Sequence, residues 1–392
     1  MRQLFQGGSM SVILFGWELG AGLGHAFNLL RIAKGLAELG HKPVFVLQNL
    51  NETRPLFAGL DYEIYQAPVW WPRPISFTAR GYADILTYHG YADAGLLLGM
   101  VQAWDRLLQN IRPDLIISDH SPTLNLAAHG RFRRVTVGTG FTVPPPGEKE
   151  FPALQPKVQP LAPDEQLLAS VSHVQAVRKG PPLETLTRIV QGDASFVTTL
   201  PELDPYAKFR RNEAVGPLKR PGPLTALPEE PYFFAYLPAD HPAIKTILGL
   251  IGRCGLKGMV YVRNAGGDLR KTLGTSKVEF VTVPQDLSQV FARTSVVLHH
   301  GGNGISSDAL AAGRPQVVCP IFLEQWLTGR RLQELGVAEL PMPEKAGEAL
   351  RLVLGGKQFY SAAQSIGEAI LQRRQEGLLP SIIRTCERLL FS

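Results

Sequence analysis

A histidine between an apolar run and a glycine-rich turn marks one place where this chain could bind an anion. Residues 296–299 read as a buried strand, and His300-Gly301-Gly302 follows them directly. Small residues at helical spacing fill 306–312, and Gly313-Arg314-Pro315 ends that helix before a second apolar run. Glycines let the backbone approach a ligand, and a helix N-terminus offers unpaired N–H groups to a negative charge. The stretch therefore predicts a diphosphate site with His300 beside it.

A second histidine, His25, opens a predicted helix near the start of the chain. Residues 11–15 form a short apolar run, residues 16–24 are rich in glycine, and residues 25–39 have helical periodicity that stops at Gly40. Together with the apolar run at 43–47 this is a βαβ unit, which implies a parallel sheet. Ligands bind at the carboxyl ends of the strands in such sheets, so His25 lies where a general base would be useful.

Asp119 could orient that base. It ends its own apolar strand at residues 114–118, and strands of one parallel sheet end at the same edge. A carboxylate on one imidazole nitrogen orients the other nitrogen for proton transfer. The alternative is an aspartate that caps the following turn. We expect Asp119 to pair with His25, and we expect the neighbouring His120 to have a structural role.

Composition limits the protein to a few classes. A chain of 392 residues with 45% hydrophobic residues is expected to form two α/β domains, and five prolines within residues 217–231 place the linker there. Three cysteines without metal spacing indicate reduced thiols and a cytoplasmic protein without a bound metal. A net charge of +6 without a basic tract argues against nucleic acid and allows, at most, weak peripheral contact with a membrane.

The N-terminus shows no targeting signal. Residues 1–9 are polar and glycine-rich, and we interpret them as an expression scar before Met10. No apolar run is long enough to predict a transmembrane helix. The loop at Gly22–Gly24 lacks the full G-x-G-x-x-G pattern with a later ribose acid, so we do not expect NAD.

These motifs resemble those of the GT-B glycosyltransferases related to the UDP-glycosyltransferases, including bacterial rhamnosyl-, macrolide- and zeaxanthin-glucosyltransferases. The resemblance spans nearly the whole chain from Met10. It implies an α/β fold of GT-B type, with two Rossmann-like domains facing each other across a cleft. Residues 10–220 would bind the acceptor, 221–375 would bind the donor, and a C-terminal helix at about 376–392 would return to the first domain. The shared residues are Gly22-Leu23-Gly24-His25, Gly40-His41, Pro284-Gln285, His300-Gly301-Gly302, Asp308, Gly313-Arg314-Pro315, Pro320 and Glu324-Gln325.

The resemblance assigns the donor site to the second domain. Pro284-Gln285 would line the nucleobase, His300 and the N–H groups near Gly302 to Ser306 would hold the diphosphate, Asp308 would bind the ribose, and Glu324-Gln325 would bind the sugar. The full expected donor site is Thr282, Val283, Pro284, Gln285, His300, Gly301, Gly302, Asn303, Gly304, Ser306, Asp308, Glu324 and Gln325.

Three positions depart from the family pattern. Thr282 stands where many plant relatives carry a tryptophan that stacks on uracil, Asp308 replaces a common glutamate, and Asn28 replaces a proline after His25. The first two leave the nucleobase open between UDP, dTDP and GDP, of which we favour UDP or dTDP.

An aromatic-rich region of the first domain is the expected acceptor site. Aromatic side chains shelter apolar acceptors and also stack on sugars, although core packing would use the same residues. Glu18, in the loop before His25, could approach the reacting sugar. The candidates are Glu18, Trp70, Trp71, Phe77, Tyr82 and Tyr88.

The sequence thus predicts an inverting, metal-independent glycosyltransferase. It would transfer a sugar from a nucleotide diphosphate to a hydroxyl of a small, partly apolar acceptor, with His25 as general base oriented by Asp119. The nucleotide sugar is a co-substrate, and no cofactor is expected. Three alternatives remain: a sugar-nucleotide epimerase or hydrolase of the same fold, a membrane-associated enzyme acting on lipid-linked cell-wall precursors, and a non-catalytic nucleotide-sugar-binding protein. The oligomeric state is not predicted.

Overall fold

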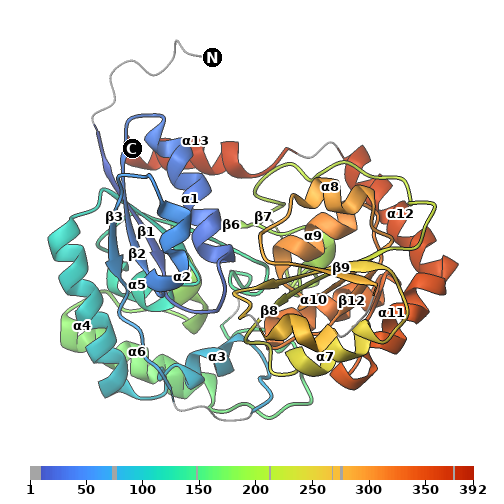
Figure 1. Ribbon diagram of the computed structural model, residues 1–392. Helices are drawn as coiled ribbons and strands as arrows, with labels where there is room; N and C mark the ends of the chain where they lie inside the picture. The colour runs from blue at the N-terminus through green and yellow to red at the C-terminus, as the bar shows by residue number, and fades with distance from the viewer. Residues whose placement is uncertain are drawn as a thin grey trace. The chain divides into compact units, whose positions relative to one another are not determined.

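The chain folds into two compact units of α/β type. The computed structural model describes residues 10–72, 77–146, 149–211, 213–266, 268–273, 277–373 and 376–392. The first unit comprises the described residues of Met1–Thr198, Tyr206–Leu218 and Leu378–Ser392, and the second comprises those of Thr199–Pro205 and Lys219–Gly377. Each unit has its own parallel sheet (Figure 1).

The sheet of the first unit has the strand order β3-β2-β1-β4-β5-β6-β7, all parallel. The order reverses between β1 and β4, and such a switch point leaves an open crevice at the carboxyl ends of the two strands. Trp17 and Asp119, the last residues of β1 and β4, are register partners there. The strands are β1 (Val12–Trp17), β2 (Lys42–Leu47), β3 (Glu63–Gln66), β4 (Leu115–Asp119), β5 (Arg134–Gly138), β6 (Ala194–Val197) and β7 (Ala214–Val215).

Helix α1 covers one face of this sheet because its buried residues recur at helical spacing. Its buried side chains run from His25 to Leu36, and Gly40 follows the helix with a φ of +94°, a left-handed conformation that suits glycine. The opposite face is covered by α5, where Asn125 accepts a hydrogen bond from Ser118 at 2.8 Å. The helices are α1 (Gly24–Ala37), α2 (Leu50–Thr53), α3 (Tyr82–Tyr88), α4 (Ala94–Ile111), α5 (Pro122–Ala128), α6 (Asp164–Arg178) and α13 (Leu379–Leu390), with 3-10 turns η1 (Arg54–Phe57) and η2 (Leu186–Val190).

The C-terminal helix α13 belongs to the first unit, as the sequence predicted. Ile382 and Cys386 are fully buried in the core cluster that contains α1 and the central strands. Glu387 forms a 2.7 Å ion pair with His41. In Figure 1 this red helix lies beside the blue helix α1.

The second unit repeats the arrangement around the strand order β10-β9-β8-β11-β12-β13, again all parallel. Here the switch point lies between β8 and β11. Helices α7 and α11 pack on one face of the sheet, and α8 and α9 pack on the other. The elements are η3 (Pro201–Leu203), β8 (Phe233–Pro238), α7 (Ile244–Gly252), β9 (Gly258–Arg263), η4 (Leu269–Leu273), β10 (Val278–Val281), α8 (Leu287–Ala292), β11 (Val296–His299), α9 (Asn303–Ala311), β12 (Gln316–Val318), α10 (Leu323–Glu334), β13 (Ala338–Glu339), η5 (Pro343–Lys345), α11 (Ala346–Gly355) and α12 (Lys357–Gln372).

A buried arginine fixes the segment that enters the second unit. The guanidinium of Arg314 donates to the carbonyl of Phe291 at 3.1 Å and to those of Thr225 and Ala226 at 3.1 and 2.6 Å. Its side chain is fully buried. The middle residue of the Gly-Arg-Pro motif therefore binds the proline-rich segment to the body of its unit.

Candidate active site

His25 and Asp119 meet at the switch point of the first sheet. His25 lies in the first turn of α1 and Asp119 ends β4, and Nδ1 of the histidine is 2.8 Å from Oδ1 of the aspartate. Both side chains are buried, and the ring of Trp17 stacks on His25 with centroids 5.5 Å apart. An ionised carboxylate only accepts hydrogen bonds, so a neutral His25 would carry its proton on Nδ1 and its lone pair on Nε2. The two sequence candidates are in contact, in the geometry of a base and its orienting group.

The backbone of Gly20 packs against Nε2 of His25 and Nδ1 of His120. A Cβ atom at this position would lie 2.8 Å from Nε2, which is too close for real contacts. The residue has a φ of +90°, a conformation that L side chains rarely adopt. Position 20 therefore favours glycine for two reasons: the positive φ, and the short contact that a Cβ would make with His25.

Glu18 is fully buried and faces the N-terminus of α5. Its Oε2 accepts from the N–H groups of Thr123 and Leu124 at 3.0 and 3.3 Å, and Oε1 accepts from the Thr123 hydroxyl. Burial raises the pKa of Glu18 to about 8, against the lowering effect of these hydrogen bonds. These contacts indicate a structural role for Glu18 rather than the proposed approach to a sugar.

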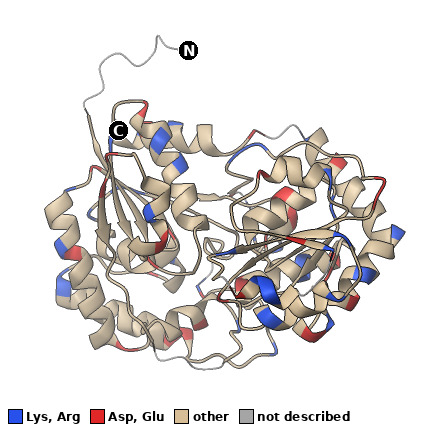
Figure 2. Ribbon diagram, viewed as in Figure 1, with Lys and Arg blue, Asp and Glu red and all other residues tan. Residues whose placement is uncertain are grey.

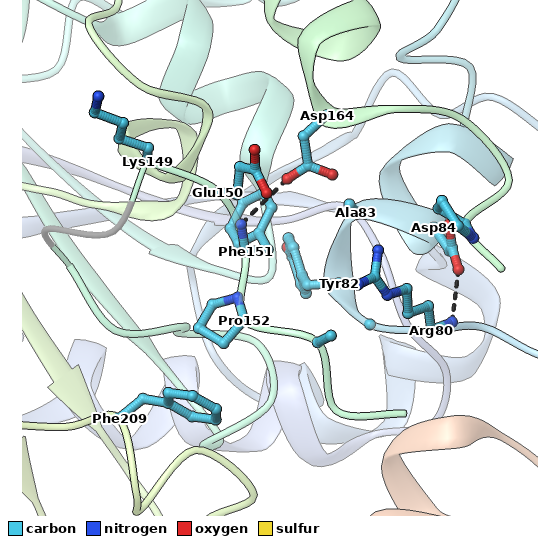
Figure 3. A pocket seen from close by; sticks show the side chains of 13 residues that line it. Arg80, Tyr82, Ala83, Asp84, Lys149, Glu150, Phe151, Pro152, Asp164 and Phe209 are labelled. Carbon is cyan, nitrogen blue, oxygen red and sulfur yellow. Dashed lines mark hydrogen bonds between the residues drawn. The ribbon is translucent and has the colours of Figure 1, made fainter. Parts of the chain in front are cut away.

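A hollow of about 660 Å³ opens in the first unit next to Tyr82. Phe151, Pro152 and Phe209 supply apolar walls, whereas Arg80 and Asp84 lie at the other side (Figure 3). The main chain of Arg80 donates to Asp84 at 2.6 Å, which fixes that side.

Tyr82 is the sequence-predicted acceptor residue that lines this hollow. Its buried ring also contacts His120, with centroids 5.7 Å apart, and His120 contacts His25 at 5.6 Å. The other aromatic candidates do not line it: the tilted rings of Phe77 and Tyr88 contact each other with centroids 5.1 Å apart, and Trp70 and Trp71 are 39% and 68% exposed. Residues 73–76, which follow Pro72, lie outside the described residues.

The second unit presents the expected strand–turn–helix. His299 ends β11 and holds the turn, because its Nδ1 accepts from the N–H of Gly301 at 2.9 Å and its Nε2 donates to Gln316 at 2.7 Å. Gly301 has a φ of +88°, and a Cβ atom at this position would lie only 2.7 Å from the carbonyl oxygen of Gln325. The turn therefore brings the glycine loop against the start of α10.

Helix α9 begins directly after this turn at Asn303, with Gly302 as its N-cap and no side chain capping it. Gly304 is exposed in the first turn, and Ser306 donates back to the carbonyl of Gly302 at 2.8 Å. Asp308 lies one turn further on and is half-buried. An uncapped N-terminus with two glycines is suited to an anion.

His300 stands beside this helix start with the ring of Tyr236 edge-on at 5.4 Å. Burial and the charge of Arg263 lower the pKa of His300 to about 4, against a smaller raising effect from the Tyr236 backbone. The imidazole is therefore neutral in this structure and would act by hydrogen bonding. Nδ1 is buried and lacks a well-formed hydrogen bond among the described residues.

Arg263 supplies a cation that the sequence analysis missed. It ends β9, and after burial its charge is the next largest cause of the lowered pKa of His300. Burial raises the pKa of Tyr236 and of Tyr261, and the charge of Arg263 opposes that rise. Within the described part of the chain its guanidinium has no ion-pair partner, and its buried Nε has no hydrogen bond. The sequence signal is an arginine directly after the apolar run 258–262, outside the family motif.

The remaining donor candidates lie on two segments. Thr282, Val283 and Pro284 are exposed after β10, where Gln285 donates to the carbonyl of Val283 at 2.9 Å. Glu324 and Gln325 lie in the first turn of α10, and the side chain of Gln325 accepts from the N–H of Ile321 at 2.8 Å. The structure places both segments in the second unit.

The described residues contain neither a membrane-spanning helix nor a cluster of metal-ligand side chains. None of their helices is long and apolar enough to span a bilayer. They contain no group of three His, Cys, Asp or Glu side chains arranged to hold a metal ion. Figure 2 shows that Lys or Arg positions and Asp or Glu positions are interspersed along the ribbons of both units.

Comparisons with known proteins place the fold. No family model matches the chain. A segment is 34% identical over 95 residues to an O-mycaminosyltylonolide 6-deoxyallosyltransferase of Streptomyces fradiae, covering 23% of this chain and 22% of that protein. Another is 29% identical over 196 residues to a PGL/p-HBAD biosynthesis glycosyltransferase of Mycobacterium tuberculosis, covering 45% and 44%. The matches thus span less than half the length of these relatives.

Solved structures match over almost the full chain. The calicheamicin glycosyltransferase CalG4 superposes with a TM-score of 0.71 at 17% identity, covering 98% of this chain and 99% of that one. The glycosyltransferase VinC in complex with dTDP gives a TM-score of 0.65 at 15% identity, covering 97% and 99%. The chain therefore has the GT-B glycosyltransferase fold, as the sequence predicted.

Proposed function

We propose that the protein is an inverting glycosyltransferase that moves a sugar from a nucleotide-diphosphate donor to a hydroxyl of a small, partly apolar acceptor. The first unit would bind the acceptor and the second the donor. The observation that carries the proposal is the buried His25–Asp119 pair, whose 2.8 Å contact lies at the switch point of the first sheet.

The chemistry follows from that pair. Nε2 of His25 takes the proton of the acceptor hydroxyl while its oxygen bonds to the anomeric carbon and the bond from that carbon to the diphosphate oxygen breaks. A single displacement of this kind inverts the anomeric configuration. Asp119 stabilises the imidazolium that forms, through the 2.8 Å contact at Nδ1.

The second unit would hold the leaving diphosphate. The N-terminus of α9 offers backbone N–H groups and the positive end of its dipole. Arg263 contributes a full positive charge, and neutral His300 contributes one N–H. In this scheme the charge on the leaving group is balanced by protein groups, so a divalent cation is not required.

Donor and acceptor classes rest on different observations. The fold shared with VinC, which was solved with dTDP, supports a dTDP- or UDP-sugar. Gln285, Asp308 and Glu324 would contact base, ribose and sugar, in line with the resemblance of their motif. The hollow beside Tyr82 has mixed polar and apolar walls and supports an acceptor with an apolar body.

A donor panel tests the binding half of the proposal. UDP-, dTDP- and GDP-sugars are added to the purified protein, and the melting temperature is measured for each. A ligand that binds only the folded state raises the melting temperature. A UDP- or dTDP-sugar should therefore raise it, and the increase should be the same when EDTA is present. Absence of a shift with every nucleotide sugar would contradict a donor site.

Substitution of the dyad tests the catalytic half. We expect His25→Ala to abolish transfer and Asp119→Asn to lower kcat about 10²-fold or more, with donor-induced thermal shifts unchanged in both. Asp114→Asn is the matched control, because Asp114 accepts from the Val12 N–H at 2.7 Å at the other end of the sheet. NMR of the product anomeric proton then reports inversion or retention.

A further inference from the structure

Two buried polar side chains lie beneath the start of helix α9. His299, the last residue of β11, is fully buried, and so is Gln316, the first residue of β12. Gln316 pairs in register with Val297, so the side chains of all three residues point to the face of the sheet that α9 covers. Apolar side chains normally fill such positions, so two polar ones require an explanation.

A chain of hydrogen bonds through these side chains joins the turn after β11 to helix α9. The main-chain N–H of Gly301 donates to Nδ1 of His299 at 2.9 Å, and Nε2 of His299 lies 2.7 Å from Oε1 of Gln316. The amide nitrogen of Gln316 then donates to the carbonyl of Ser306 at 3.3 Å. Every polar atom of the two side chains therefore has a partner within the second unit.

The two ends of this chain fix its direction. A main-chain N–H only donates and a carbonyl oxygen only accepts, so Gly301 requires a lone pair on Nδ1 and Ser306 requires an N–H of the amide. Nε2 of His299 must then carry the ring proton and donate to Gln316. Burial, with a smaller effect from the charge of His300, lowers the pKa of His299 to about 3, so the ring is neutral and keeps its lone pair at neutral pH.

The turn that His299 holds is the one that would carry the diphosphate. Helix α9 begins after this turn with no side chain capping its N-terminus, and such an N-terminus binds anions. The turn also lies against α10, since a Cβ atom at Gly301 would be 2.7 Å from the carbonyl oxygen of Gln325. A displacement of the turn would therefore move His300 relative to α9 and α10, on which other donor candidates lie.

We propose that His299 is a positioning residue for the donor diphosphate: through Gly301 and Gln316 it holds the turn 300–302 and the start of α9 in the arrangement that binds the anion. The inference rests on the proposed function, and it assigns the fixed geometry of that site to a side chain that does not touch the ligand. A turn that is already ordered loses less conformational freedom when a ligand binds, so the affinity depends on His299.

Three variants separate the hydrogen bonds from the volume of the side chain. His299→Asn keeps an oxygen near the position of Nδ1 that accepts from Gly301, whereas His299→Phe keeps a ring without an acceptor. Gln316→Met removes the link from His299 to Ser306. Arg314→Met is the control for a general loss of stability, because this buried arginine binds the segment that enters the unit and not the turn.

Titration calorimetry measures the Kd of dTDP, or of UDP where UDP gives the larger thermal shift, at a temperature at which every variant is folded. We expect His299→Phe to weaken binding about tenfold or more, His299→Asn to stay within about threefold of the parent, and Gln316→Met to lie between them. In a steady-state assay the donor KM should rise in the same order, while the acceptor KM stays unchanged.

Unchanged affinity in His299→Phe would overturn the inference. An equal loss in His299→Asn would also overturn it, because the bond to Gly301 would then not be responsible. A tenfold loss in Arg314→Met would assign the effect to general destabilisation instead. Failure of the proposed function is distinguishable, because in that case no nucleoside diphosphate would bind the parent protein or His25→Ala would remain active.

Discussion

The backbone of Gly20 lies against the imidazole of His25, so closely that a Cβ at Gly20 would stand 2.8 Å from Nε2. The contact joins the loop after β1 to the first turn of α1. It makes Gly20 a sensitive probe of whether the position of the histidine matters for activity.

Gly20→Ala should lower transfer activity at least about 10²-fold, because the added methyl group would lie 2.8 Å from Nε2 and displace the imidazole from its position beside Asp119. Gly40→Ala is a close control. Its φ is +94° against +90° for Gly20, so the backbone strain is similar, but a Cβ there meets nothing within 4 Å. We expect both variants to lose a similar amount of thermal stability and only Gly20→Ala to lose activity in a steady-state assay. Equal activity of the two would mean that transfer does not depend on the position of His25 beside Asp119.

Arg263→Met should weaken binding of dTDP or UDP about tenfold or more, because it removes a cation without a competing carboxylate partner beside His300. Titration calorimetry at two salt concentrations measures the effect, and the variant should also lose part of the salt dependence. Lys271→Met is the control, since Lys271 is exposed and pairs with Asp268. Unchanged affinity in Arg263→Met would remove this residue from the donor site.

Arg314→Met should destabilise the second unit by about 3 kcal/mol, because the carbonyls of Thr225, Ala226 and Phe291 lose a buried donor. A melting temperature lowered by several degrees is the expected readout, with little change in nucleotide affinity once folded. Arg330→Met, on the exposed surface of α10, should be neutral. A stability equal to that of the parent would mean that the segment is held by other contacts.

Glu18→Gln should remove a pH dependence of stability. The pKa of Glu18 is raised from 4.5 to about 8 in the fold, so between these values the native state holds a proton that the unfolded chain releases. Stability contributed by this group is therefore present below about pH 4.5 and is lost as the pH rises towards 8. Urea denaturation at pH 5 and pH 8 should show a smaller difference for the variant than for the parent. If the variant and the parent lose the same stability between pH 5 and pH 8, the titrating group is not Glu18.

The alternation of strands and helices was predictable, because an apolar run or a helical spacing of apolar residues can be seen within one short stretch of sequence. The meeting of His25 and Asp119 was also predictable, since parallel strands end at one edge of their sheet. Their roles as base and orienting group remain predictions.

Other features depend on contacts that sequence spacing does not encode. Glu18 precedes His25 in a glycine-rich loop, yet its side chain points inward to the start of α5, more than a hundred residues later. Arg263 gains its relevance only from the proximity of His300, which lies on a different strand. The short segment Thr199–Pro205 belongs to the second unit, although the residues before and after it belong to the first. Two hydrogen bonds hold it there: Asn303 donates to Thr199, and Arg331 donates to the carbonyl of Glu202 at 3.3 Å.

The place of α13 in the first unit has a consequence for synthesis on the ribosome. The helix follows the second unit in the chain, but Ile382 and Cys386 complete the core against which α1 packs. A nascent chain that has emerged only as far as Gly377 therefore holds a finished second unit and a first unit whose α1 still exposes an apolar stripe. His25 lies on that helix, so the proposed base becomes firmly placed only after the rest of the molecule has folded, and nascent chains are open to aggregation until then.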